Sequence, residues 1–165
     1  MKPEVRRVQA ALDALGLQRR VIELERSAHT SQQAADALGV AVGSIAKSLV
    51  FTVHERPVLV IASGANRVDE EKLTILAGGP ARRADADTVK RATGFVIGGV
   101  APIAHETPLE IFIDEDLLRL ELIYAAAGVP ECVFPLSPAE LVRATGGRVV
   151  DVKEQRKPVI KGERP

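Results

Sequence analysis

Apolar residues recur at helical spacing in five stretches of the chain. Within each stretch they fall three or four positions apart, which places them on one face of a helix. Capping residues mark several starts: Thr30 and Gln33 form a capping box, Asp69 is an N-cap, and Asp85 or Asp87 is another. We therefore predict helices over residues 3–15, 30–39, 69–78, 85–94 and 137–146.

Short runs rich in valine, isoleucine and phenylalanine lie between these helices and predict strands. The two longest runs are separated only by His54-Glu55-Arg56, which indicates a hairpin. The predicted strands cover residues 21–24, 48–53, 57–63, 95–97, 111–113, 122–124 and 132–134. Because strands come in adjacent pairs with helices between the pairs, we expect an α+β fold, whose mixed, mostly antiparallel sheet has about six to seven strands flanked by helices.

The length of 165 residues fits one domain with a core of its own. Aromatic residues make up only 3% of the chain, so valine, leucine, isoleucine and alanine must fill that core. We expect the domain to cover residues 1–152. Residues 153–165 are polar and contain two prolines, and we expect them to form a mobile tail.

The charge balance excludes a broadly basic surface. The chain has 22 lysines and arginines against 22 acids, so we expect no DNA partner. The charge is uneven, however, because residues 105–121 hold six acids against one arginine, and residues 143–165 hold seven lysines and arginines against three acids. Both stretches are typical of solvated faces, and the basic stretch is also compatible with an arm beside a phosphate chain.

The absence of targeting signals and the single cysteine favour a cytoplasmic protein. The first residues lack the apolar core of a signal peptide, and no run approaches a membrane span, so we expect no membrane partner. Cys132 is the only cysteine, which excludes an internal disulfide and a cysteine-based zinc site. Because Cys132 falls in an apolar predicted strand, we expect a structural thiol rather than a nucleophile.

Common catalytic motifs are missing, and one lysine remains as a candidate. The chain has no G-x-S-x-G elbow, no H-E-x-x-H and no phosphate-binding glycine loop, and its three histidines lie far apart in sequence. We therefore expect neither a metal nor another cofactor. Lys47 stands at the start of the apolar strand Leu49-Val50-Phe51. It could hold a phosphate or a carboxylate as a point charge, or it could be a solvated lysine at a strand end.

A glycine-rich loop is the second candidate. In Gly98-Gly99-Val100-Ala101-Pro102, two glycines permit positive φ and close backbone approach, and the proline stiffens the exit. Such a loop can point several N–H groups into one concavity, which suits a carbonyl or an oxyanion. The alternative interpretation is a plain turn after a strand.

Three segments together resemble the YbaK/EbsC family, which comprises free-standing relatives of the editing insertion of bacterial prolyl-tRNA synthetase. The segments are IAKSLVF at 45–51, ASGANRVD at 62–69 and TGFVIGGVAP at 93–102. The order of elements agrees as well, and the resemblance covers about residues 5–152. It implies a single α+β domain with a curved mixed sheet around a small pocket. It also implies hydrolysis of the ester that joins a wrong amino acid to tRNA, with the tRNA acceptor end as partner.

The resemblance also implies which residues form the site. Lys47 matches the family lysine that is needed for activity, and His105 falls either at the pocket rim or in a turn. The residues implied to bind the substrate are Gly98, Gly99, Val100, Ala101, Pro102, Ser63, Gly64, His105 and Thr30. The family generally uses no protein nucleophile and no metal, so the vicinal ribose hydroxyl of the substrate would activate the attacking water.

Two departures from the family leave the substrate open. Members that act on cysteinyl-tRNA resemble Ser-Gly-Gly where this chain has Ala125-Ala126-Ala127-Gly128, and members that act on alanyl-tRNA have His-Pro-Leu where it has Phe134-Pro135-Leu136. We predict a trans-acting deacylase for a small amino acid on tRNA-Pro or a related tRNA, with prolyl-tRNA synthetase as a candidate partner. The alternatives are a binding module or synthetase adaptor without turnover, and an esterase or amidase for small metabolites, for which the sequence shows no nucleophile.

Overall fold

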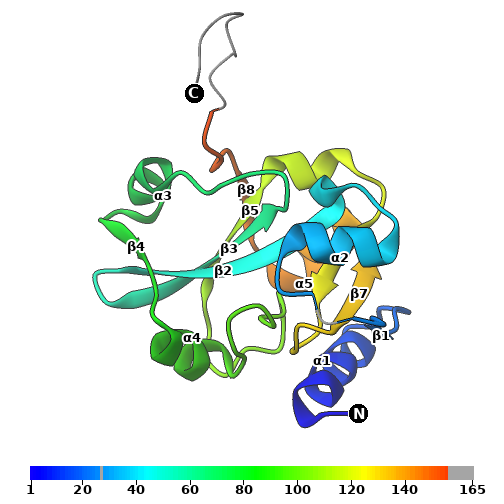
Figure 1. Cartoon of the computed structure of the whole chain (residues 1–165). Coiled ribbons are helices and arrows are strands. Elements are labelled where there is room, and N and C mark those ends of the chain that lie inside the picture. The colour runs from blue at the N-terminus through cyan, green and yellow to red at the C-terminus, as the bar shows by residue number, and fades with distance from the viewer. Residues whose placement is uncertain (27, 156–165) are drawn as a thin grey trace, which may run out of the picture.

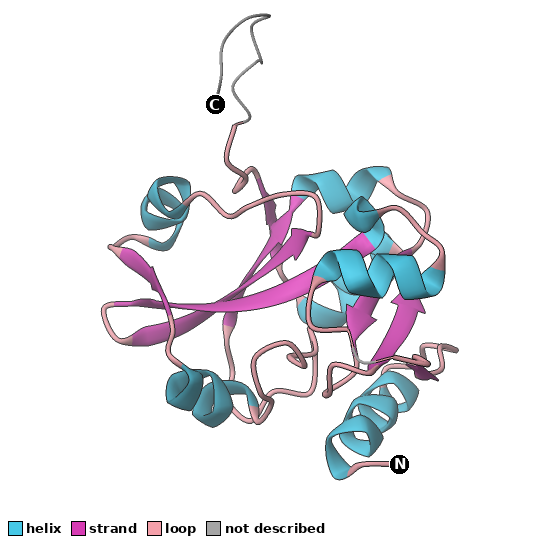
Figure 2. Cartoon of the chain, viewed as in Figure 1, coloured by secondary structure: helices cyan, strands magenta, loops and turns pink. Residues whose placement is uncertain are grey.

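The computed structural model describes residues 1–26 and 28–155, in which helices surround one mixed sheet (Figures 1 and 2). The helices are α1 (Pro3–Ala14), α2 (Ser31–Leu38), α3 (Glu70–Ala77), α4 (Ala86–Thr93) and α5 (Pro138–Thr145), with 3-10 turns η1 (Val42–Ser44) and η2 (Glu115–Arg119). The strands are β1 (Ile22–Glu23), β2 (Ile45–Val53), β3 (Arg56–Ser63), β4 (Ala81–Arg83), β5 (Glu110–Asp114), β6 (Ile123–Ala126), β7 (Cys132–Leu136) and β8 (Arg148–Val150).

The sheet is built around the long β2–β3 hairpin. Its strand order is β1-β7-β6-β2-β3-β5-β8, and β4 pairs with β2 outside this path. Four of the pairings are antiparallel and three are parallel: β2 with β6, β3 with β5, and β5 with β8. The hairpin turns at His54 and Glu55, which both have positive φ, as a two-residue turn of the twist-matching type requires.

Most of the predicted elements are confirmed, including all five helices and the α+β class with its mixed sheet. The predicted strand at 95–97 is wrong, because this segment turns directly after α4. Gly94 caps α4 in the left-handed region, and the Phe95 N–H donates to Thr93 Oγ1 at 3.0 Å, which bends the chain out of the helix. The described sheet has eight strands rather than six to seven, because β4 and β8, of three residues each, carry too little apolar pattern to be predicted.

Three groups of buried side chains fill the space between the sheet and the helices. The largest joins the apolar face of α1, through Val5, Val8 and Leu12, to the inner face of the sheet at Phe134 and Leu136. A second lies beneath α3 and includes the aromatic rings of Phe51 and Phe112, and a third lies beneath α2. The sheet therefore has apolar cores on both faces, which hold β2 rigidly in the centre of the molecule.

The last described residues of the chain pack against the body of the domain, near the top of Figure 1. Lys153 pairs with Val68 in an antiparallel bridge, and the Glu154 N–H donates to Arg67 O at 2.8 Å. Residues 153–155 of the predicted tail thus lie against the domain, and its remaining residues, 156–165, fall outside the described part.

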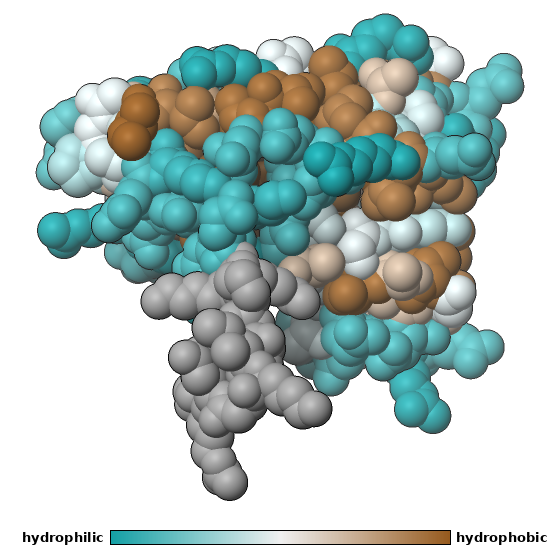
Figure 3. All heavy atoms as spheres, turned by 90° about the horizontal axis from the view of Figure 1, so that it is seen from above, coloured by the Kyte–Doolittle hydropathy of each residue, from teal (hydrophilic) through white to brown (hydrophobic). Residues whose placement is uncertain are grey.

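On the face seen from above, hydrophilic residues share the surface with bands of apolar ones, so that face is not uniformly apolar (Figure 3). In the described residues, no helix has both the length and the apolar character needed to span a membrane.

Candidate functional site

A pocket of about 250 Å³ lies beside the middle of β2. One wall is the start of α2, the opposite wall is the segment that joins β4 to α4 together with the glycine-rich loop, and β6 and β7 close the end. The lining residues are Ala28, His29, Thr30, Ser31, Ala34, Ile45, Ala46, Lys47, Ser48, Leu49, Val50, Arg83, Ala84, Val89, Ile97, Gly98, Val100, Tyr124, Ala126, Pro130 and Val133. The lining is mostly small and apolar, with a few polar groups, as is usual for a site that takes a small organic group.

Lys47 places a cation in this pocket. Within the described residues, its ammonium has no hydrogen bond or ion pair. Burial lowers the pKa of Lys47, the positive charges of Arg83 and Arg67 lower it further, and the Asp114 carboxylate acts in the opposite direction. An incompletely neutralised cation in a pocket that apolar groups surround is suited to bind an anion or a developing negative charge.

Arg83 joins Lys47 at the pocket, which the sequence did not suggest. It ends β4, and its guanidinium lies over the Phe51 ring at 5.6 Å from the centroid. Like Lys47, Arg83 has no carboxylate partner among the residues that the structure describes. The pair of cations gives one side of the pocket a positive potential that favours a phosphate near the bound group.

The glycine-rich loop contributes two of its five residues to the pocket wall. Gly98 and Val100 line the pocket, and Gly98 has φ of +89°, which agrees with the expected positive φ. Gly99, Ala101 and Pro102 do not line the pocket, and the N–H of Gly99 donates to Val96 O at 3.0 Å. That N–H closes the turn and is therefore not free to point into the concavity as the sequence interpretation proposed.

The start of α2 positions Thr30 at the pocket. The predicted capping box is present: Gln33 N–H donates to Thr30 Oγ1 at 3.1 Å, and Gln33 Oε1 accepts from Thr30 N–H at 3.2 Å. Thr30 and Ser31 both line the pocket. Because the Thr30 hydroxyl already caps the helix, its first role is to fix the backbone of this wall.

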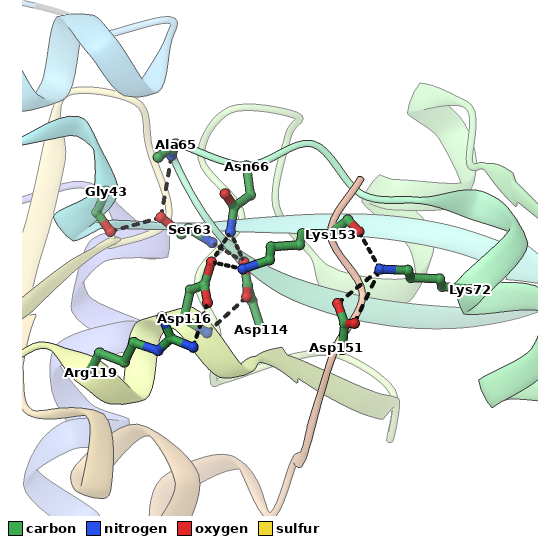
Figure 4. Close-up of polar contacts among 10 residues, drawn as sticks. All are labelled: Gly43, Ser63, Ala65, Asn66, Lys72, Asp114, Asp116, Arg119, Asp151 and Lys153. Carbon is green, nitrogen blue, oxygen red and sulfur yellow. Dashed lines mark hydrogen bonds and ion pairs between the residues drawn. The ribbon is translucent and has the colours of Figure 1, made fainter. Parts of the chain in front are cut away.

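Ser63 and Gly64 lie behind the pocket rather than in its lining. Ser63 is buried, its Oγ donates to Gly43 O at 2.9 Å, and its N–H donates to the buried carboxylate of Asp114 at 3.1 Å (Figure 4). A Cβ on Gly64 would lie 2.5 Å from Val42 O and 2.9 Å from Ser31 Cβ. Gly64 therefore lets the end of β3 pass close to the α2 wall.

A polar cluster extends from Ser63 to the C-terminal segment, as Figure 4 shows. The Asn66 side-chain amide donates to Asp114 and to Asp116, at 2.9 Å in each case, and the Lys153 ammonium lies 2.7 Å from Asp116 Oδ2. The Lys153 partner lowers the pKa of Asp116, and so does the Asn66 hydrogen bond. The cluster links β3 and β5 to the C-terminal segment at Lys153, so its role is structural.

His105 supports the glycine-rich loop from behind. It does not line the pocket, and its Nε2 lies 2.7 Å from Ala101 O, so the ring donates a hydrogen bond to that carbonyl. Its ring also meets Phe95 edge-on, with the centroids 6.4 Å apart. Of the two placements that the sequence left open, the geometry is that of a turn behind the loop.

We expect the unfolding free energy of His105→Gln to fall less than that of the parent protein when the pH is lowered. Burial lowers the pKa of His105; the Ala101 hydrogen bond raises it, and the Arg7 charge lowers it. A histidine whose pKa is lower in the folded state destabilises that state as pH falls from about 7.5 to about 5, through its unfolded value of about 6.5. Glutamine can still donate to Ala101 O but does not titrate. Urea unfolding at both pH values should therefore show a smaller loss for the variant, and equal losses would contradict this role.

Cys132 is a core residue, as the sequence predicts. It is 8% exposed, and burial, followed by the charges of Glu23 and Glu131, raises the pKa of its thiol. A thiol that holds its proton is a poor nucleophile. Cys132→Ala should keep the activity of the protein and cost about 1 kcal/mol of unfolding free energy. Denaturant unfolding and a turnover assay on the same preparation check both, and lost turnover in a folded variant would make the thiol functional.

No group of three or more His, Cys, Asp or Glu side chains in the described residues is arranged to hold a metal ion. The histidine of the pocket, His29, has no such neighbours there. The polar groups of the pocket are hydroxyls, backbone groups, the His29 imidazole and the two cations. Such groups can bind, orient and stabilise charge.

Comparisons with known proteins relate the whole pocket to one family. A model of the aminoacyl-tRNA editing domain matches residues 25–144. The uncharacterized protein YwhH of Bacillus subtilis (strain 168) is 34% identical over 134 residues, which are 80% of this chain and 85% of YwhH. A proline--tRNA ligase of Maridesulfovibrio salexigens is 33% identical over 91 residues, which are 54% of this chain but 16% of the ligase. This chain thus matches about a sixth of that ligase.

A solved structure gives the same result for the fold. It belongs to a protein proposed to be a trans-editing enzyme for prolyl tRNA synthetase, and it matches with a TM-score of 0.90 and 46% identity over 94% of this chain and 99% of that chain. The family match contains every lining residue of the pocket, from Ala28 to Val133. The resemblance seen in the sequence is therefore confirmed, and the chain belongs to the aminoacyl-tRNA editing domain family.

Proposed function

We propose that this protein is a trans-acting deacylase, which hydrolyses the ester of a mischarged tRNA that carries a small amino acid. The observation that carries the proposal is the pocket itself: its volume of about 250 Å³ suits a small aminoacyl group, and the unneutralised Lys47 stands in it. The family match and the likeness to a proposed trans-editing enzyme support this assignment. The match with proline--tRNA ligases favours tRNA-Pro or a related tRNA, and makes prolyl-tRNA synthetase a candidate partner.

The chemistry asks little of the protein, because an aminoacyl ester is already activated. Water adds to the ester carbonyl, the vicinal ribose hydroxyl takes its proton and passes it on, and the ribose oxygen leaves with that proton. The protein holds the ester in place, which can supply about 7–11 kcal/mol of barrier lowering at best. Lys47 and Arg83 would hold the terminal phosphate or the developing charge, and the pocket wall at Gly98 and Val100 would confine the acyl group.

A panel of tRNAs charged with wrong amino acids tests the proposal. We expect release of free amino acid from at least one small mischarged residue, and little release from correctly charged prolyl-tRNA. Adding a metal chelator should leave the rate of release unchanged, provided that a control shows the tRNA still folded. Binding of charged tRNA without release would instead indicate a binding module, and hydrolysis of simple esters but of no charged tRNA would indicate a metabolite esterase.

A further inference from the structure

The central strand of the sheet has a bare edge in its middle. One edge of β2 pairs with β3 along its whole length. On the other edge, β2 pairs with β6 only at Ile45 and Ala46, and with β4 only from Phe51 onward. Residues 47–50 therefore have no strand beside them on that edge, and this gap lies in the centre of the sheet rather than at its border.

The register shows which backbone groups turn towards β3. The Gly64 N–H donates to Ile45 O at 2.7 Å, so Ile45 belongs to a hydrogen-bonded pair across the hairpin. Antiparallel strands alternate between hydrogen-bonded and non-hydrogen-bonded pairs. The N–H and C=O groups of Lys47 and Leu49 must therefore also turn towards β3.

The groups between them point the other way, into the gap. The Ala84 N–H donates to Val50 O at 3.0 Å, which shows directly that Val50 faces outward. Because the pairs alternate, the N–H and C=O groups of Ser48 also face outward. In the described residues, no partner is present for three of these groups: the Ser48 N–H, the Ser48 C=O and the Val50 N–H.

These three groups belong to the pocket, because Ser48 and Val50 both line it. Backbone polar groups within a folded domain are nearly always paired, with protein, water or ligand. The Ser48 hydroxyl is also buried without a hydrogen-bond partner. Unpaired polar groups therefore gather in the middle of the central strand of the sheet, and this part of β2 lines the pocket.

We propose that the aminoacyl group of the substrate docks on this edge as a strand of one residue. Its ammonium donates to the Ser48 C=O, and its ester carbonyl accepts from the Ser48 N–H, or from the Val50 N–H when the group runs in the opposite direction. An aminoacyl ester offers one donor and one acceptor, spaced as in a residue of a strand, which is the complement of a free edge. This inference rests on the proposed function and adds the part of the site that holds the reacting carbonyl.

The docking mode has a consequence for selectivity. Edge hydrogen bonds read the ammonium and the carbonyl, which all aminoacyl groups share, so they select for a free α-amino group and not for a side chain. The side chain must then be chosen by the apolar walls on either side of the edge, such as Ala34 and Val100. An N-acetylated or α-hydroxy acyl group should bind less well for lack of the ammonium.

Amide hydrogen exchange measured by NMR tests the proposal on the whole protein. The probe is an adenosine that carries an amide-linked amino acid on its 3′ carbon, which cannot be hydrolysed. We expect saturating probe to slow exchange at Ser48 or Val50 by about tenfold, the factor that corresponds to one net hydrogen bond of about 1.4 kcal/mol. Lys47 and Leu49 are the internal controls, because their N–H groups already bond to β3 and should not change.

Each remaining outcome would overturn the proposal. If the probe shifts the amide signals of Gly98 and Val100 but leaves exchange at Ser48 and Val50 unchanged, the edge is not used and the proposed function stands. Equal slowing at all four strand positions would indicate general stabilisation and would likewise refute edge docking. If the probe does not bind at all, the proposed function fails together with this inference.

A backbone substitution gives a second, independent measurement. Replacing the amide of Ser48 by an ester removes its N–H but keeps its side chain, and the ester at Val50 does the same one step along. We expect one of these two proteins to bind the probe about tenfold more weakly. Its unfolding temperature should fall only a little, because no ladder donor is lost and only the preceding carbonyl becomes a weaker acceptor towards β3. An ester at Leu49 should instead lower the unfolding temperature. Parental affinity in both outward-facing variants would contradict the proposal.

Discussion

Replacing Lys47 with methionine should lower the rate of deacylation by about 100-fold or more, a loss near 2.7 kcal/mol of transition-state stabilisation. Methionine keeps the length and the apolar stem of the side chain but removes the one cation of β2 that faces the pocket. Arginine should rescue only in part, because its planar fork differs from a compact ammonium. Single-turnover rates with a cleaved mischarged tRNA measure the effect.

The same substitution should leave the fold intact. Burial lowers the pKa of Lys47, so the folded state holds the proton less tightly than the unfolded state. The resulting penalty is present below the lowered pKa and disappears as pH rises towards the ordinary lysine value, so removing the charge should maintain or raise the unfolding free energy at neutral pH. Lys72→Met is the matched control, since Lys72 pairs with Asp151 and does not line the pocket. Parental turnover in Lys47→Met would remove Lys47 from the site.

Local signals predicted most of the fold. The helices begin at capping residues that the structure confirms, as in the box of Thr30 and Gln33, because a cap depends only on residues a few positions apart. The prediction of a strand at 95–97 was wrong because the apolar Phe95 belongs to a turn and not to a strand. Its ring is buried in the core, and the Arg7 guanidinium of α1 lies over it at 4.3 Å from the centroid. A contact between residues so far apart in sequence leaves no periodic signal.

The site could be predicted only where a motif marks it. Lys47 and Gly98 were singled out from their sequence context, and the structure places both in the pocket. Arg83 lines the same pocket but stands outside the three segments of the resemblance, and Ser48 lies within the segment of Lys47 but drew no attention beside the lysine. Their importance depends on the gap between β4 and β6, and that gap is a property of the sheet order, which brings together strands that are distant in sequence. The bare edge of β2 could not have been predicted from composition or spacing.

The second large effect is expected at Gly99, where valine should strongly reduce deacylation. The family resemblance implied that Gly99 binds the substrate, but Gly99 does not line the pocket. A Cβ would instead lie 2.9 Å from Gly128 O and 2.9 Å from Val129 Cα, and both are backbone atoms that cannot swing away. The loop must therefore shift as a body, which moves the pocket wall at Gly98 and Val100. A displacement of about 1 Å can cost about 100-fold in rate.

Gly98→Ala is the matched control for this argument, because it separates backbone strain from collision. Gly98 has φ of +89°, but a Cβ there would meet only Pro130 Cγ at 3.8 Å. We expect alanine at 98 to cost about 1 kcal/mol of stability from the left-handed conformation, with a smaller loss of rate than Gly99→Val. Turnover and thermal unfolding of both variants decide the matter. If Gly99→Val turns over like the parent, the close approach of the two loops does not hold the pocket wall in place.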